Sequence, residues 1–171
     1  MGPRKSLRLK DYDYSLPGYY FVTICTYDRA CIFGSIINTE NKLNQHGMIA
    51  QKYLLDISSH FESVNMDCFV VMPNHIHFIL QINSVGAIHE LLDNQGIQEK
   101  ESNRRQMLLP KVVGYYKMNV SKQIRLQTPD TKVWQRNYYE HVIRNENELE
   151  VHREYIQNNP LKWDQDQYFK N

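Results

Sequence analysis

The sequence lacks an excess of charge of either sign. Its 171 residues include 20 Lys and Arg against 19 Asp and Glu, which leaves a formal charge of +1. A chain so balanced has no overall field that would draw it to nucleic acid or to a membrane surface, so a local cluster of charge must recognise any such partner. Long apolar runs are also missing. We therefore expect neither a membrane-spanning segment nor a signal peptide.

Cysteine is scarce, and the three that occur, Cys25, Cys31 and Cys68, form no CxxC pair. An odd number of cysteines without such a pair argues against a disulfide framework and against a zinc knuckle. We therefore expect reduced, mainly buried thiols in a soluble cytoplasmic protein. The length predicts one compact domain over residues 1–171, without an internal repeat.

Strand-like and helical periodicities alternate along the chain. Runs rich in β-branched and aromatic residues predict strands over 19–27, 64–72, 75–82 and 133–143. Apolar residues at helical spacing predict helices over 44–61, from Pro110 to about Thr128, and from a capping-box pattern at Asn145 and Glu148 through Asn158. This order, β(β)αββαβα with no repeated βαβ unit, favours an α+β fold, namely a ferredoxin-like antiparallel sheet with helices packed on it.

The connections between these elements carry their own signals. Pro73-Asn74 suits a tight turn, so 64–72 and 75–82 should form a hairpin. We expect the strand at 19–27 to pair with residues 31–37. The polar stretch 84–107 predicts a connection whose second half is mobile.

Two histidines stand one residue apart in an apolar strand, VVMPNHIHFILQI (70–82). Alternate residues of a strand share a face, so His75 and His77 point one way while Ile76 and Phe78 point the other. The apolar face can pack on the helices, which leaves the histidine face free. Imidazoles on residues about 6 to 7 Å apart at Cα can converge on one cation.

The HxH pattern alone is a weak indicator, because structural histidines and zinc hydrolases also produce it. A zinc enzyme needs further strong ligands, yet His46, His60 and His89 show no matching spacing. The pair therefore favours Mg²⁺ or Mn²⁺, with weaker oxygen ligands and substrate phosphate completing the site.

The last predicted helix brings a phenol and an amide to one face. Tyr155 and Asn159 stand four residues apart in EYIQNNPLKW (154–163), with His152 and Glu148 adjoining. The alternative interpretation is a helix tyrosine with its ring on the core and its hydroxyl in water.

VVMPNHIHFIL, VWQRNYYEHVIRN and EYIQNNPLKW, in this order and spacing, resemble the REP-associated tyrosine transposases and the related single-tyrosine insertion-sequence transposases of the HUH endonuclease superfamily. The resemblance covers nearly the whole chain. It implies a ferredoxin-like catalytic domain in which His75 and His77 bind a divalent metal and Tyr155 is the nucleophile. Asn159 stands where the insertion-sequence branch has a metal-binding glutamine, and its shorter side chain reaches less far.

The activity implied by the resemblance is metal-dependent cleavage and transfer of single-stranded DNA through a covalent 5′-phosphotyrosine. The family acts on hairpin or palindromic DNA, as mobile elements or domesticated relatives. His141, on a strand face with Tyr139, is a candidate supporting or DNA-contacting residue. His152, one turn before Tyr155, is either a helper of the nucleophile or a packing residue. Tyr115, Tyr116, Tyr138 and Tyr139 compete for the nucleophile role, but only Tyr155 matches the family position.

Two basic clusters could bind the DNA backbone. The first is an N-terminal arm over 1–17, and the second lies between 100 and 136. The residues selected from them are Arg4, Lys5, Arg8, Lys10, Arg104, Arg105, Lys117, Arg125 and Arg136. The alternative for about half of such cations is ordinary solvated charge.

Two other function classes stay open. One is a catalytically inactive hairpin-DNA-binding protein of the same fold, and the other is a small zinc hydrolase. The joint presence of His75, His77 and Tyr155 argues against the first. The lack of a third strong metal ligand argues against the second. The sequence leaves open whether the active unit is a monomer or a homodimer that shares its tyrosines.

Overall fold

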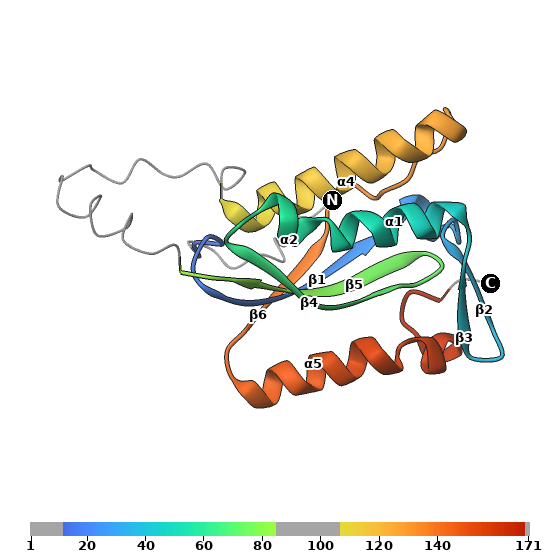
Figure 1. The fold of residues 1–171 in the computed structure, drawn as a ribbon. Coiled ribbons are helices and arrows are strands. Elements are labelled where there is room, and N and C mark those ends of the chain that lie inside the picture. Colours follow the sequence, from blue (N-terminus) through green and yellow to red (C-terminus); the bar gives the residue numbers. More distant parts are fainter. Residues whose placement is uncertain (1–11, 85–106, 170–171) are drawn as a thin grey trace, which may run out of the picture.

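The computed structural model describes residues 12–84 and 107–169, and it has three layers (Figure 1). The middle layer is an antiparallel sheet with the strand order β4-β5-β1-β6. Its strands are β1 (Gly18–Cys25), β4 (Val64–Val71), β5 (His75–Ile82) and β6 (Tyr139–Ile143). One face carries α1 (Gln45–Leu55), α2 (Ile57–His60) and α4 (Leu108–Gln127), and the other carries α5 (Glu146–Asn158).

The topology is ferredoxin-like, as the sequence predicted. The elements β1, α1, β4, β5, α4 and β6 follow one another along the chain, and β1 and β5 become the two central strands. His75 lies opposite Cys25, and His77 lies opposite Thr23. Both histidines are therefore held in the middle of the sheet, where neighbouring strands fix the backbone on both sides.

One face of β5 packs against the helices, as its apolar residues predicted. Ile76, Phe78 and Leu80 are fully buried in the core beneath α1 and α4. Tyr116 on α4 adds a hydrogen bond from its hydroxyl to the carbonyl oxygen of Ala50, at 3.1 Å. Burial of these large apolar side chains is the main force that closes this layer.

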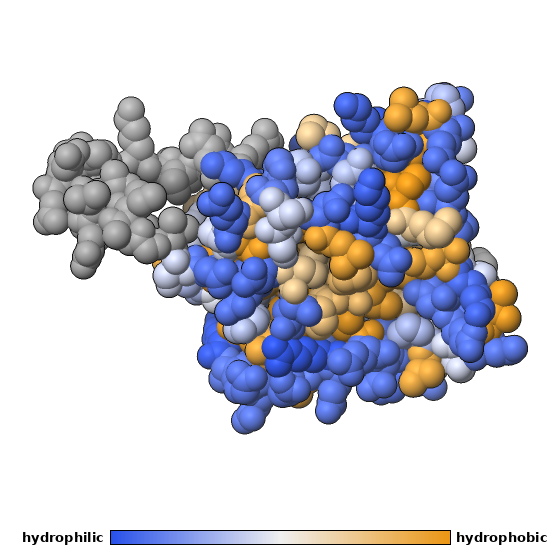
Figure 2. All heavy atoms as spheres, in the orientation of Figure 1, coloured by the Kyte–Doolittle hydropathy of each residue, from blue (hydrophilic) through white to orange (hydrophobic). Residues whose placement is uncertain are grey.

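A second, smaller core fixes α5 to the opposite face. Leu149 and Ile156 of the helix pack on Ile79 and Ile143 of the sheet. At the start of the helix, the Asn145 side chain accepts a hydrogen bond from the backbone N–H of Glu148 at 2.9 Å, which confirms the predicted N-cap. Polar side chains cover the outer surface of α5, whereas apolar surface gathers between the helical layers (Figure 2).

Three sequence predictions differ from the structure. Residues 31–37 do not pair with β1, because β5 and β6 occupy both of its edges. Instead β2 (Gly34–Ile37) folds back on β3 (Glu40–Leu43) through Asn38 and Thr39, both at positive φ. The predicted helix 44–61 is divided at Asp56 into α1 and α2. The predicted strand 133–143 is regular only as β6, with one further bridge between Thr26 and Trp134.

The remaining segments are short. The 3-10 helices η1 (Tyr27–Arg29) and η3 (Pro160–Gln165) follow β1 and α5. The predicted connection 84–107 and the arm 1–17 lie largely outside the described residues. Within the described residues, no helix is long and apolar enough to cross a membrane.

Candidate metal and tyrosine site

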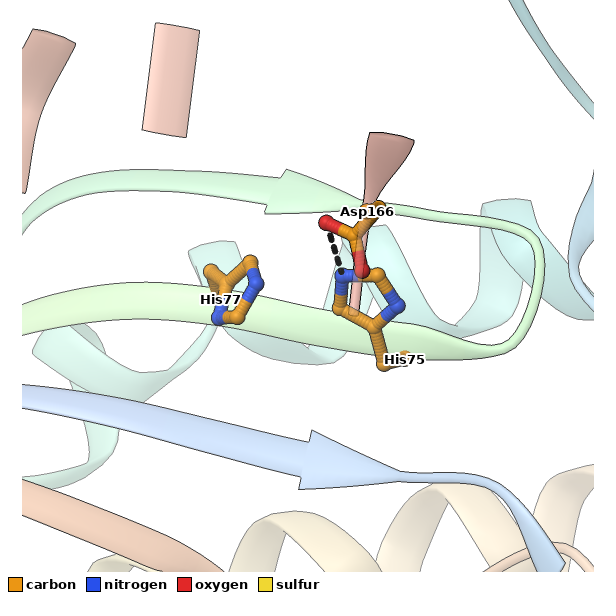
Figure 3. Close-up of side chains that lie close together, drawn as sticks. All are labelled: His75, His77 and Asp166. Atoms are coloured by element: carbon orange, nitrogen blue, oxygen red, sulfur yellow. Dashed lines mark ion pairs between the residues drawn. The ribbon is translucent and has the colours of Figure 1, made fainter. Parts of the chain in front are cut away.

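His75 and His77 lie side by side on β5, with ring centroids 4.5 Å apart (Figure 3). The sequence predicted that their face would be open, but their exposed fractions are 0% and 1%. The rings of Trp163 and Tyr168 pack against His75 at centroid distances of 6.1 and 4.7 Å. The segment after α5 therefore closes over the histidines, which the local strand pattern could not reveal.

The hydrogen bonds of His75 leave one ring nitrogen available. Its Nδ1 lies 2.8 Å from Oδ1 of Asn74, whose amide nitrogen donates to the carbonyl oxygen of Tyr168 at 2.7 Å. The Asn74 oxygen must therefore accept, so Nδ1 of His75 carries the proton and Nε2 keeps a lone pair. This buried Nε2 has no hydrogen-bond partner among the described residues. An unpartnered, buried lone pair fits a metal ligand.

His77 is oriented by Thr23, whose Oγ1 lies 2.7 Å from its Nδ1. Its Nε2 lies 3.4 Å from the hydroxyl of Tyr155. Burial lowers the pKa of His75 to about 4, and it also holds the pKa of His77 well below its ordinary value. Both imidazoles are therefore neutral at neutral pH, which is the form that binds metals.

Asp166 and Asn159 add oxygen atoms to the pair. One ligand atom from each of His75, His77 and Asp166 lies within 4.8 Å of the other two. Figure 3 shows the Asp166 carboxylate beside His75, with 3.9 Å between its Oδ2 and Nε2. The amide nitrogen of Asn159 donates to the same carboxylate at 2.9 Å, while its Oδ1 is buried without a partner among the described residues. Two neutral nitrogens, a carboxylate and an amide oxygen fit a divalent cation.

Asp166 is the site residue that sequence reasoning missed. It follows Pro160 in a segment without periodicity, so no spacing connects it to the histidines. The described structure holds it in place through its Oδ1, which accepts a hydrogen bond from the backbone N–H of Tyr168 at 2.6 Å.

Tyr155 stands at the border between the buried histidines and solvent. Its exposed fraction is 38%, and Phe21 lies beside its ring at a centroid distance of 6.0 Å. Burial, with the nearby charge of Asp166, raises the pKa of the phenol. The hydroxyl is therefore protonated at neutral pH and must lose its proton to become a nucleophile.

The other candidate tyrosines are less well placed. Tyr116 is fully buried between the helices and the opposite sheet face. Tyr115 stacks on His60, with ring centroids 3.9 Å apart. Tyr139 is 41% exposed and opens onto the same cavity as Tyr155. Tyr138 is half-buried and packs against the main core.

His141 and His152 form a stacked pair beside Tyr155, with ring centroids 5.2 Å apart and planes 8° apart. Glu148 holds both imidazole rings in position. Its carboxylate lies 2.6 Å from His141 Nε2, and its backbone oxygen accepts a hydrogen bond of 2.8 Å from His152 Nδ1. Backbone and imidazole donors hold the pKa of Glu148 below its ordinary value.

Three of the predicted DNA-contacting residues share a groove on the α4 side of the sheet. Lys117, Arg125 and Arg136 line it, and its volume is about 750 Å³. Lys122 and Lys132 lie in the same groove, so five cations face it and no carboxylate does among its described lining residues. Lys117 also donates a hydrogen bond to the carbonyl oxygen of Gln135 at 2.6 Å, so it fixes the segment before β6 as well. The remaining predictions, Arg4, Lys5, Arg8, Lys10, Arg104 and Arg105, lie outside the described residues.

Comparison with known proteins shows the class of the fold. No family model matches the chain. The structure aligns with that of a REP-associated tyrosine transposase bound to a REP hairpin, at a TM-score of 0.54 and 18% identity, over 91% of this chain and 73% of the other. A crystal structure of a "putative transposase" from Deinococcus radiodurans aligns at a TM-score of 0.50 and 14% identity, over 88% and 95%. The fold is therefore that of the tyrosine transposases.

Two curated relatives come from Haemophilus influenzae. An "Uncharacterized protein" is 39% identical over 97% of this chain and 93% of its own length. A "Putative REP-associated tyrosine transposase" is 29% identical over 88% of this chain and 74% of its own length. The second of these relatives and the aligned hairpin-bound structure both carry the name of the REP-associated tyrosine transposases, which agrees with the resemblance that the motifs indicated.

Proposed function

We propose that this protein is a metal-dependent endonuclease and strand transferase for single-stranded DNA, with Tyr155 as its nucleophile. The observation that carries the proposal is the position of the Tyr155 hydroxyl, 3.4 Å from Nε2 of His77, whose neighbour His75 has an unpartnered Nε2 among the described residues. In the described structure this distance joins residues of one chain, which supports a site whose tyrosine and histidines belong to the same chain.

His75 and His77 would hold the cation, Mg²⁺ or Mn²⁺, with oxygen atoms of Asp166 and Asn159. When bound, it would act as a Lewis acid toward the scissile phosphate. The chain prepares this site by keeping both imidazoles neutral and by fixing the His75 tautomer through Asn74. The remaining positions of such an ion suit phosphate and water.

The reaction needs only one protein nucleophile. The Tyr155 oxygen forms a bond to phosphorus as the bond from phosphorus to O3′ breaks, and the electron pair leaves on O3′, which takes up a proton. The phenol loses its proton to water, which reaches the exposed part of the side chain. The product is a 5′-phosphotyrosine and a free 3′-hydroxyl. A second 3′-hydroxyl can reverse the step, so cleavage and rejoining need no external energy source.

A DNA hairpin is the proposed substrate. A related transposase was solved bound to a REP hairpin. In this protein the groove of Lys117, Arg125 and Arg136 offers a basic surface to a phosphate backbone. We assign the same role to Arg4, Lys5, Arg8, Lys10, Arg104 and Arg105 on their charge alone.

The test is covalent trapping. Hairpin-bearing single-stranded oligonucleotides are incubated with the protein and Mg²⁺ or Mn²⁺, and denaturing gels are scored for a protein–DNA adduct. Tyr155→Phe should abolish the adduct, and His75→Ala and His77→Ala should abolish the adduct that forms with Mg²⁺ or Mn²⁺. Tyr115→Phe is the matched control, because this ring stacks on His60 on the α4 side of the sheet. An adduct that survives Tyr155→Phe and disappears in Tyr168→Phe would refute the assignment.

A zinc hydrolase is the second candidate, and one observation favours it. The sequence argued against this class because a third strong ligand was missing, but Asp166 supplies one. Stoichiometric zinc in the purified protein, together with no adduct on any hairpin, would support hydrolysis over strand transfer.

A further inference from the structure

A cavity of about 580 Å³ adjoins Tyr155. Its lining includes Phe21 of β1, Tyr139 and His141 of β6, and His152 and Tyr155 of α5. The metal-site residue His77 also borders it. The cavity therefore begins where the proposed reaction takes place and continues toward β6.

The aromatic rings around this cavity form a connected wall. Phe21 lies 4.7 Å from His152 and 5.2 Å from His77 between ring centroids, and the His77 contact is stacked. His152 in turn stacks on His141. Tyr139 and Tyr155 are 41% and 38% exposed. Partly exposed, flat aromatic faces around an open space are suited to a nucleobase, because every base has a π-face on which a ring can stack.

One cation, Arg29, reaches the cavity from a strained turn. Asp28 and Arg29 both have a φ of 54°, a left-handed conformation that is sterically unfavourable for a non-glycine residue. The surrounding structure supports this turn, since Arg29 donates to the carbonyl oxygen of Gln167 at 3.2 Å and lies over the ring of Tyr168. No carboxylate is among the described residues that line the cavity. Its charge therefore complements an anion.

We propose that this cavity, which we call the base pocket, receives one unpaired nucleotide adjoining the scissile phosphate. The base lies against the rings of Tyr139, His141 and His152, and Arg29 faces the backbone phosphate. The inference rests on the proposed function, in which the substrate is single-stranded DNA. It adds a protein contact to the nucleotide next to the cleaved bond. Glu148 preorganises the pocket by holding both histidine rings in place.

If the pocket binds one nucleotide, one base of the oligonucleotide should contribute more to affinity than its neighbours do. Stacking of a base on an aromatic side chain changes affinity by about 5- to 150-fold. In a series of hairpin oligonucleotides, each with one abasic site in the unpaired strand, we expect one position next to the cleavage site to lose about tenfold in affinity and in initial rate of adduct formation. The measurements are fluorescence anisotropy for affinity and denaturing gels for the adduct.

Protein variants then connect that position to the pocket. Tyr139→Ala and His141→Ala should weaken binding of the intact oligonucleotide by a similar factor and should no longer respond to the abasic site. Tyr115→Ala is the matched truncation of a ring outside the pocket and should keep the response. The inference is overturned if every abasic oligonucleotide binds with the affinity of the intact one, or if both pocket variants keep the full response. Absence of any adduct refutes the proposed function instead, and the binding series still decides the pocket.

Discussion

The contact between α5 and the edge strand β4 allows a quantitative prediction. Arg153 of α5 donates two hydrogen bonds to the carboxylate of Asp67, at 2.7 and 2.9 Å. Asp67 lies at an irregularity in β4, between Met66 and Cys68, where the pairing register shifts. Such a bulge re-aims a side chain, and here the side chain meets the helix that carries Tyr155.

The expected energy follows from geometry and exposure. The side chains of Arg153 and Asp67 are 27% and 17% exposed, so water screens the pair only in part. Exposed ion pairs contribute about 0.2 to 1 kcal/mol, while bidentate, charge-assisted pairs are stronger. We expect a coupling energy of about 1 to 2 kcal/mol, which corresponds to a decrease of about 3 to 6 °C in the melting temperature of a chain of this size.

A double-mutant cycle measures this energy. Arg153→Met, Asp67→Asn and the double variant are compared by urea unfolding. Arg153 also contacts Glu146 and Glu150, and the contribution of these contacts to the free energy of unfolding cancels in the cycle. Glu150→Gln is the control and should change the free energy of unfolding by less than about 0.5 kcal/mol. A coupling energy below about 0.5 kcal/mol would refute the reasoning, as would a value unchanged by 1 M salt.

Two further predictions concern the glycines and the thiols. Gly47→Ala should destabilise the protein by about 1 to 3 kcal/mol in thermal unfolding, since the new Cβ would lie 2.1 Å from a backbone oxygen. Gly114→Ala, in helix α4 with nothing within 4 Å of its Cβ, should instead stabilise it by about 0.5 to 1 kcal/mol, and equal effects of the two would contradict this account. Burial raises the pKa of Cys25 to about 11 and of Cys68 to about 12, whereas Cys31 is exposed. Because only the thiolate reacts, a disulfide reagent at pH 8 should titrate Cys31 at once and the other two only after denaturation; two fast thiols would be inconsistent with this structure.

The three cysteines agree only in part with the environment that composition predicted for them. The sequence predicted reduced, mainly buried thiols, and Cys25 is buried while Cys68 is half-buried. Cys31 is exposed and lies in the irregular segment between η1 and β2, not in a strand paired with β1. A composition argument assigns a typical environment to a residue type, and it cannot place one residue in a loop.

The sequence by itself determined those features that depend on neighbours along the chain. The alternation in 75–82 separated the histidines from the core face, and Asn145 marked the start of α5. Spacing of four residues put Tyr155 and Asn159 on one face of a helix. Such features follow from periods of 2 and 3.6 residues, which are properties of the backbone.

Only the tertiary structure decided how the two halves of the site meet and what covers them. Asp166 joins His75 through a turn after α5, and the base pocket forms because β6 and α5 bring His141 and His152 into contact. These contacts depend on the order of strands in the sheet and on the docking of α5 by Leu149 and Ile156. No local period encodes them, because packing between distant segments is a property of the whole core.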